Sequence, residues 1–135
     1  MLVTAAVAAL LMSVPALRAQ SAAAPSAEEI KKDLETIKKG RTLVIQPAPG
    51  TDDSSGATQL RIDNTSSFKM IVLIVGPTTQ RVELDGERMQ TLAVEPGDYE
   101  IAVSIVGRIS VPPFYGKQKI EPKKFFIQRF VVPVF

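Results

Sequence analysis

Apolar and polar residues alternate along most of the chain from residue 41 onward, and turn-forming residues interrupt the alternation at regular intervals. A period of two is typical of β-strands with one buried face. In residues 59–64, Leu60 and Ile62 fall on one face and charged residues fall on the other. Residues 68–75 are apolar at nearly every position, which predicts a central strand buried on both faces.

Similar patterns predict further strands over residues 42–46, 80–84, 89–94, 99–105, 117–120 and 124–132. The dipeptide Asp85-Gly86 is typical of a hairpin turn, so we expect the strands on either side of it to pair. Glu121-Pro122 predicts a closing hairpin in the same way. About seven strands in about 95 residues is the density of an antiparallel sandwich. We therefore predict an all-β fold, a single antiparallel β-sandwich of about seven strands over residues 41–135, preceded by a short N-terminal helix.

The short helix is expected ahead of the strands. Ser26 followed by Glu29 has the spacing of a capping box, which marks a helix start. The apolar residues that follow recur at the helical period and form one narrow stripe: Ile30, Leu34 and Ile37. We interpret the helix as a strut that packs this stripe against the flank of the sandwich. A partner-binding helix is the alternative.

The start of the chain has features of an export signal. Residues 1–17 carry no charged side chain, and the apolar stretch 2–12 has the length of a signal-peptide core but is short for a membrane span. Small residues offer cleavage after Ala19 or within 22–24, although no Lys or Arg precedes the apolar stretch. We predict a signal peptide over 1–19, with cleavage as late as 24, and a linker and helix over 20–40. The mature protein would be periplasmic or secreted, without a membrane span, and the Ala-rich leader favours a bacterial source. An uncleaved anchor is the alternative.

Composition excludes most kinds of catalysis. None of the 135 residues is Cys or His, so disulfides, His/Cys metal sites and thiol or imidazole nucleophiles are ruled out. Carboxylate and Ser-Lys chemistry remain, but the pattern indicates no cleft and the chain has no Trp, a usual platform for sugars. We expect no enzymatic activity, no cofactor and no metal. A carboxylate-based hydrolase is the remaining enzymatic alternative.

Acidic residues lie in the predicted loops, where several oxygens together could hold calcium: Asp52, Asp53, Asp85, Glu87, Glu95 and Asp98. Their spacing is not that of an EF-hand loop, and we interpret them as solvated turn residues. A carbohydrate- or calcium-dependent envelope-binding module is the alternative. Asn64-Thr65-Ser66 satisfies the N-glycosylation pattern, and we interpret it as a turn.

The segment Leu-x-Val-x-Pro-Gly-x-Tyr, residues 92–99, resembles the stretch that carries the tyrosine corner of fibronectin type III and other immunoglobulin-like domains. It also resembles the Pro-Gly-x-Tyr strand of transthyretin-like, or carboxypeptidase-regulatory-like, bacterial modules. The resemblance covers about a dozen residues and implies a β-sandwich in which Pro96, Gly97 and Tyr99 are structural. Tyr99 would bury its ring and return its hydroxyl to the backbone. Residues 95–98 fit a type II turn with positive φ at Gly97. The immunoglobulin Cys and Trp hallmarks are missing, and without His no catalytic transthyretin relative is implied.

Charge is unevenly distributed along the chain. Residues 20–107 contain 9 basic and 13 acidic residues, whereas residues 108–135 contain 6 basic residues against Glu121 alone. Two aromatic residues, Phe114 and Tyr115, lie in a predicted proline-bearing loop, and four lysines follow them: Lys117, Lys119, Lys123 and Lys124. We predict that these six residues form a binding site, with aromatic anchors and lysines that attract an anionic partner. The alternative is that the aromatics cover the sandwich edge and the lysines protect an exposed strand.

The predicted function is that of an exported, non-enzymatic β-sandwich module for protein interaction or envelope structure. Its partner would be an unknown protein or an anionic envelope surface. Nucleic acid is not expected, because the net charge is only +2 and an exported protein seldom meets it.

Overall fold

The computed structural model describes residues 25–107 and 111–132, so the predicted signal peptide lies outside the described residues. In the described part of the chain, helix α2 (Ala27–Lys39) precedes nine strands. The strands are β1 (Leu43–Val44), β2 (Gly50–Asp52), β3 (Gln59–Asn64), β4 (Met70–Val75), β5 (Gln80–Leu84), β6 (Met89–Ala93), β7 (Gly97–Ile105), β8 (Phe114–Ile120) and β9 (Lys124–Phe130). Within these ranges no helix is long and apolar enough to cross a membrane.

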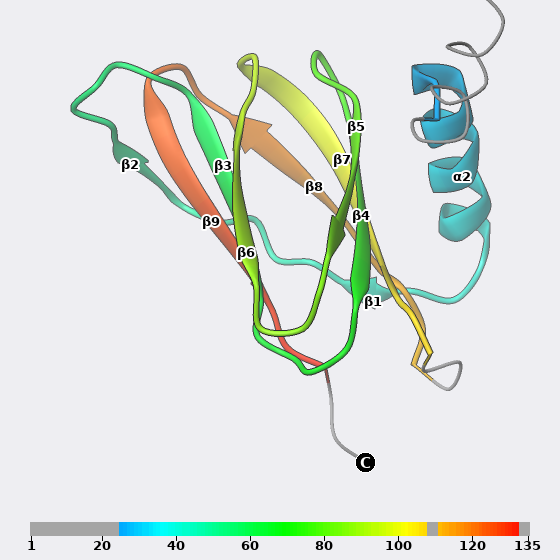
Figure 1. Cartoon of the computed structure of the whole chain (residues 1–135). Coiled ribbons are helices and arrows are strands. Elements are labelled where there is room, and N and C mark those ends of the chain that lie inside the picture. Colours follow the sequence, from blue (N-terminus) through cyan, green and yellow to red (C-terminus); the bar gives the residue numbers. More distant parts are fainter. Residues whose placement is uncertain (1–24, 108–110, 133–135) are drawn as a thin grey trace, which may run out of the picture.

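The strands form two sheets that pack face to face, which confirms the predicted all-β sandwich with a short N-terminal helix (Figure 1). One sheet has the order β1-β8-β7-β4-β5 and the other the order β2-β9-β3-β6. Two neighbouring pairs are parallel, however: β1 with β8, and β3 with β9. The sheets are therefore mixed rather than wholly antiparallel. Parallel partners are far apart in sequence, and no turn signal marks them.

Both predicted hairpins are wrong. β5 and β6 belong to different sheets, and so do β8 and β9. The turn after Asp85 does form, with Arg88 N donating to Asp85 O at 3.3 Å, but it carries the chain from one sheet to the other. Gly86 is required there because a Cβ would lie 2.6 Å from Ser67 O, while the positive φ of 61° falls on Glu87. Alternation shows only that each strand faces a core, and strands of either sheet do so.

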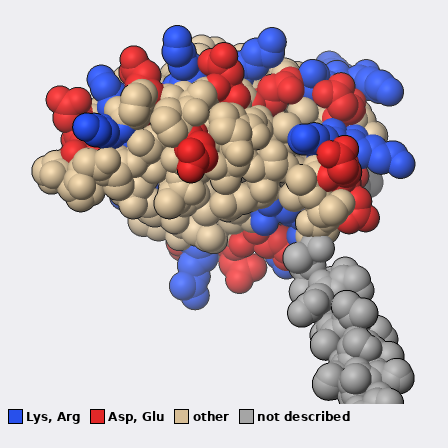
Figure 2. Space-filling model, turned by 90° about the horizontal axis from the view of Figure 1, so that it is seen from above, with Lys and Arg blue, Asp and Glu red and all other residues tan. Residues whose placement is uncertain are grey.

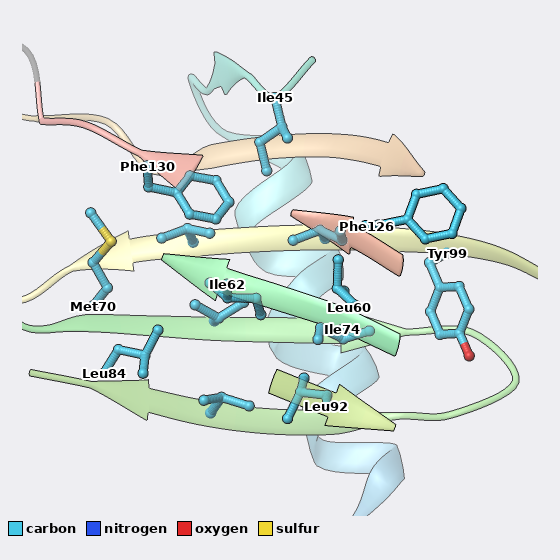
Figure 3. Packing of buried hydrophobic residues seen from close by; sticks show 14 of the residues in the cluster. Ile45, Leu60, Ile62, Met70, Ile74, Leu84, Leu92, Tyr99, Phe126 and Phe130 are labelled. Carbon is cyan, nitrogen blue, oxygen red and sulfur yellow. The ribbon is translucent and has the colours of Figure 1, made fainter. Parts of the chain in front are cut away.

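The main core lies between the two sheets (Figure 3). Every second residue of β3 and β4 points into it, including Leu60, Ile62 and Ile74, all with no exposed surface. Phe126 and Phe130 of β9, which lies beside β3 in the same sheet, also point into the core and are 2% and 3% exposed. Burial of this apolar surface provides the main stabilisation of the fold.

Helix α2 covers the outer face of the β1-containing sheet, as Figure 1 shows. The predicted capping box is present, with Ser26 N donating to Glu29 Oε1 at 2.8 Å and Glu29 N donating to Ser26 Oγ at 3.2 Å. The predicted stripe packs as a second cluster, in which Ile30 and Leu34 are buried against Leu73 of β4. β4 is thus buried on both faces, as predicted, because the helix covers the face that the sandwich leaves open.

Candidate functional site

The two aromatic residues of the predicted site lie in a strand and not in a loop. Phe114 and Tyr115 are the first residues of β8, so their side chains point to opposite faces of the sheet. Phe114 packs against the main core, with its ring centroid 5.8 Å from that of Phe130. Tyr115 packs against the α2 cluster. They therefore form no paired aromatic anchor on the surface, which corrects the sequence-based prediction.

The four lysines are divided between two strands of different sheets and the turn that joins them. Lys117 and Lys119 lie on β8, where their register partners across the sheet are Glu100 and Asp98 of β7. Such opposite charges in direct register favour the pairing of the strands. Sequence could not show this, because the acidic partners lie about 20 residues away.

The remaining two lysines lie where the chain passes from β8 in one sheet to β9 in the other. Lys123 adopts a positive φ of 60° in the turn before β9. Lys124 begins β9 and approaches Asp52 of β2 at 3.9 Å and Glu121 at 3.8 Å. Neither is on the same strand as Lys117 and Lys119.

A pocket of about 970 Å³ lies where α2, the segment linking β1 to β2, and strands β7 and β8 meet. It contains Lys117 and Lys119 but none of the other four predicted site residues. Pro47, Pro49, Asp98, Lys117 and Lys119 are exposed there, so the pocket has both apolar and charged surface. Its lining consists of Lys38, Pro47, Ala48, Pro49, Gly50, Val75, Gly76, Asp98, Tyr99, Glu100, Lys117, Gln118, Lys119, Glu121 and Phe126.

One wall of the pocket is held by a cluster of Lys38, Glu100 and Tyr115. Lys38 Nζ lies 2.8 Å from Glu100 Oε2, and the Tyr115 hydroxyl donates to the same oxygen. Lys38 Nζ also lies 5.6 Å from the centre of the Tyr115 ring. The hydrogen bond from Lys38, followed by that from Tyr115, lowers the pKa of Glu100. Burial and the bond to Glu100 raise the pKa of Tyr115, and Glu100 raises that of Lys38. All three shifts keep the cluster in its paired state at neutral pH, which suits a clamp better than a proton-transferring group.

Two buried glutamines hold the opposite wall. Gln118 Oε1 accepts hydrogen bonds from Ala48 N at 2.7 Å and from Gln128 Nε2 at 2.9 Å. Gln118 Nε2 returns a bond of 3.2 Å to Ala48 O, and Gln128 Nε2 donates to Gln46 O at 3.0 Å. The pair thus fixes residues 46–48, which cross from β1 at the edge of one sheet to β2 at the edge of the other. Neither glutamine was predicted as a site residue, although a polar residue at the inward middle position of Phe126-x-Gln128-x-Phe130 is a signal that the sequence carries for Gln128.

Tyr99 lies at the edge of the pocket, 2% exposed, and donates from its hydroxyl to Glu95 O at 2.5 Å. The hydroxyl also accepts a bond from Thr78 N at 3.2 Å. Burial and the returning bond are what the tyrosine-corner resemblance implies for this position. The predicted type II turn is not formed. Gly97 has a φ of 148° and is already the first residue of β7, where it pairs with Ile120 of β8. Glycine is still required there, since a Cβ would lie 2.6 Å from Pro77 Cγ.

The acidic loop residues do not meet. Among the described residues there is no group of three or more carboxylates that could hold a metal ion. Figure 2 looks down on one end of the sandwich and shows acidic side chains interspersed with basic ones around the rim. Asp53 is bonded within its own turn, where the Ser55 hydroxyl lowers its pKa.

Asn64, the first residue of the glycosylation pattern, is 2% exposed. Its Nδ2 donates to the backbone oxygens of Phe68, Leu84 and Asp85, and its Oδ1 accepts from Ser66. The side chain thus ties the turn after β3 to the passage between the sheets. Because Nδ2 is the atom that glycosylation would modify, this supports the turn interpretation.

The chain matches no protein-family model and no curated protein.

Proposed function

We propose that the protein is an exported, non-enzymatic β-sandwich module that binds another protein through the pocket between α2 and residues 47–50. The observation that carries the proposal is the joint exposure of Pro47 and Pro49 and of Lys117 and Lys119 at this pocket. Export rests on the apolar leader at the start of the chain.

An extended peptide segment with an acidic side chain fits this surface best. Proline rings present apolar area that is already ordered, which lowers the entropic cost of binding. Among the described residues, neither Lys117 nor Lys119 has a carboxylate within ion-pair distance, although acidic residues stand opposite them in register. Their ammonium groups can therefore turn toward a ligand carboxylate. The walls are held in place by the Lys38 cluster and the glutamine pair, so binding would not have to order the site.

Site-directed crosslinking tests the proposal directly. The chain has no cysteine, so Ala48→Cys gives one attachment point for a photo-crosslinker at the pocket. Thr36→Cys on the exposed face of α2 is the matched control. We expect a partner from the cell envelope to crosslink at residue 48 and not at residue 36, and to bind again when purified.

The lysines provide a second test with the purified partner. Lys117→Gln/Lys119→Gln should weaken its binding about tenfold and reduce the salt dependence, while Lys31→Gln/Lys32→Gln on the helix should leave both unchanged. Equal crosslinking at residues 36 and 48, or unchanged binding by the Lys117/Lys119 variant, would contradict the proposal.

A further inference from the structure

Strand β6 is an uncovered sheet edge without the usual protection. Its five residues, Met-Gln-Thr-Leu-Ala, include no charge, proline or glycine, and four of them are exposed. Met89, the largest apolar residue among these four, is 59% exposed. Edges of this kind are templates for pairing with another strand, and proteins usually shorten them or place charges on them.

The other three sheet edges do carry such protection. β1 has only two residues, and β2 has three, including Asp52. β5 is as long as β6 but carries Arg81 and Glu83, whose charged groups lie 2.5 Å apart. Among the four edge strands of the described residues, β6 is therefore the one that is five residues long and carries no charge.

The backbone of β6 offers a defined set of hydrogen-bonding groups. Asn64 N donates to Arg88 O at 2.9 Å, and Val94 N donates to Thr58 O at 3.2 Å, so these two ends face β3. Because bonding direction alternates along an antiparallel strand, Met89, Thr91 and Ala93 direct their N–H and C=O groups to the open edge. The edge therefore presents three donors and three acceptors, centred on Thr91.

We infer that β6 pairs antiparallel with β6 of a second copy of this chain, with the two Thr91 residues opposite each other on the twofold axis. This is the one register that pairs all three outward-facing residues of both strands, because Met89 then meets Ala93 of the other copy. About six hydrogen bonds form, and the exposed Met89 side chain is partly covered. Any extended strand offers alternating N–H and C=O groups, but a second copy also brings an edge that is equally long and free of charge, proline and glycine, and the twofold axis forms each contact twice.

The contact is small compared with a stable interface of about 800 Å² per partner, so the dimer is weak and depends on concentration. It uses a different surface from the proposed pocket, so either proposal can fail without the other.

Disulfide trapping tests the register, since the native chain has no cysteine. Thr91→Cys should form a covalent dimer under mild oxidation at least about tenfold faster than Thr51→Cys, an exposed threonine on the β2 edge. The Cα atoms of a hydrogen-bonded pair lie about 5.5 Å apart, within disulfide range. In an equal mixture, Met89→Cys and Ala93→Cys should crosslink to each other faster than to themselves.

Sedimentation equilibrium of the unmodified protein should show a dimer that dissociates on dilution. Thr91→Lys should abolish it, and Thr51→Lys should not. Equal trapping rates for Thr91→Cys and Thr51→Cys, a monomer at every concentration up to about 1 mM, or a dimer that persists in Thr91→Lys would each overturn the inference.

Discussion

At the scale of single residues, most of the polar side chains buried in this protein hold irregular backbone in place. Asn64 binds the turn after β3 and the passage from β5 to β6, and Gln118 binds the segment that crosses from β1 to β2. The described residues contain no buried side-chain nitrogen or oxygen without a hydrogen-bond partner. These bonds matter because an unpaired buried polar group costs about 1–3 kcal/mol.

Tyr99 gives the first prediction. Tyr99→Ala should lower the free energy of unfolding by about 3–5 kcal/mol, because it removes a buried ring. Tyr99→Phe should lower it by about 0.5–1.5 kcal/mol, because it removes only the bonds to Glu95 O and Thr78 N. Denaturant melts measure both values. Equal stability of Tyr99→Phe and wild type would show that the corner hydrogen bond contributes nothing, and equal stability of Tyr99→Ala and wild type would show that the buried ring contributes nothing.

The glutamine pair gives a second prediction. Gln118→Met should cost about 1–3 kcal/mol, because Ala48 N loses its acceptor. Gln128→Met should cost less, since it removes donors to Gln118 Oε1 and Gln46 O but leaves Ala48 satisfied. A double-mutant cycle by urea unfolding should give a coupling energy of about 0.5–3 kcal/mol. Strict additivity would show that the two side chains act independently.

At the scale of elements, α2 is attached to the sheet by an apolar stripe and by one charged cluster. The stripe covers Leu73 and Ala102, which have 3% and 0% exposure. The cluster joins Lys38, near the end of the helix, to Glu100 and Tyr115 on two adjacent strands. The apolar stripe and the charged cluster at the Lys38 end together fix the orientation of the helix on the sheet.

The cluster predicts a specific dependence on pH. Because the pKa of Glu100 is lowered in the folded state, its stabilisation is present above the unfolded value, about 4.3, and disappears as the pH falls through the folded value. Glu100→Gln should therefore reduce stability at pH 7, by about 1 kcal/mol or less, and the difference should shrink below about pH 4.

Denaturant midpoints of both proteins between pH 7 and pH 3 make this comparison. Glu35→Gln is the matched control, because Glu35 also approaches Lys38, at 3.3 Å, but is 55% exposed. It should lower stability at pH 7 by less than Glu100→Gln does, because an exposed ion pair contributes little. A difference between wild type and Glu100→Gln that stays constant down to pH 3 would rule out the clamp.

At the scale of the whole molecule, the last strand lies in the middle of its sheet. β9 runs between β2 and β3, and it contributes Phe126 and Phe130 to the core. This sheet is therefore complete only when β9, near the C-terminus, has inserted between β2 and β3. Such non-local pairing is typical of slowly folding β-proteins.

This topology predicts that a chain ending at Glu121 does not fold. It should lack a cooperative unfolding transition and dispersed amide resonances, because the parallel partner of β3 is missing. Adding a peptide of residues 122–135 should restore both signals. A peptide with Phe126→Ser and Phe130→Ser is the control and should not. Cooperative unfolding of the shortened chain alone would show that β9 is dispensable.

Local patterns in the sequence were sufficient for the elements and for the faces they bury. The helix start at Ser26, the stripe with Leu34, and the doubly buried strand β4 all follow from spacing and hydrophobicity, because these properties act over a few residues. The burial of Tyr99 followed from a resemblance over about a dozen residues. The signal peptide, the export and the function stay predictions.

Tertiary structure alone decided which strands are neighbours and where the pocket lies. Alternation shows that a strand has a buried face, but the passages after β5 and β8 cross between sheets with the same turn residues that would close a hairpin. For that reason Phe114 and Tyr115, neighbours in sequence, were predicted to act together and are separated by the thickness of the sheet. The pocket joins Lys38, the segment 47–50 and Lys117, because long-range pairing of β1 with β8 and of β2 with β9 places them together. Such contacts depend on the total free energy of the packed chain and leave no local pattern in the sequence.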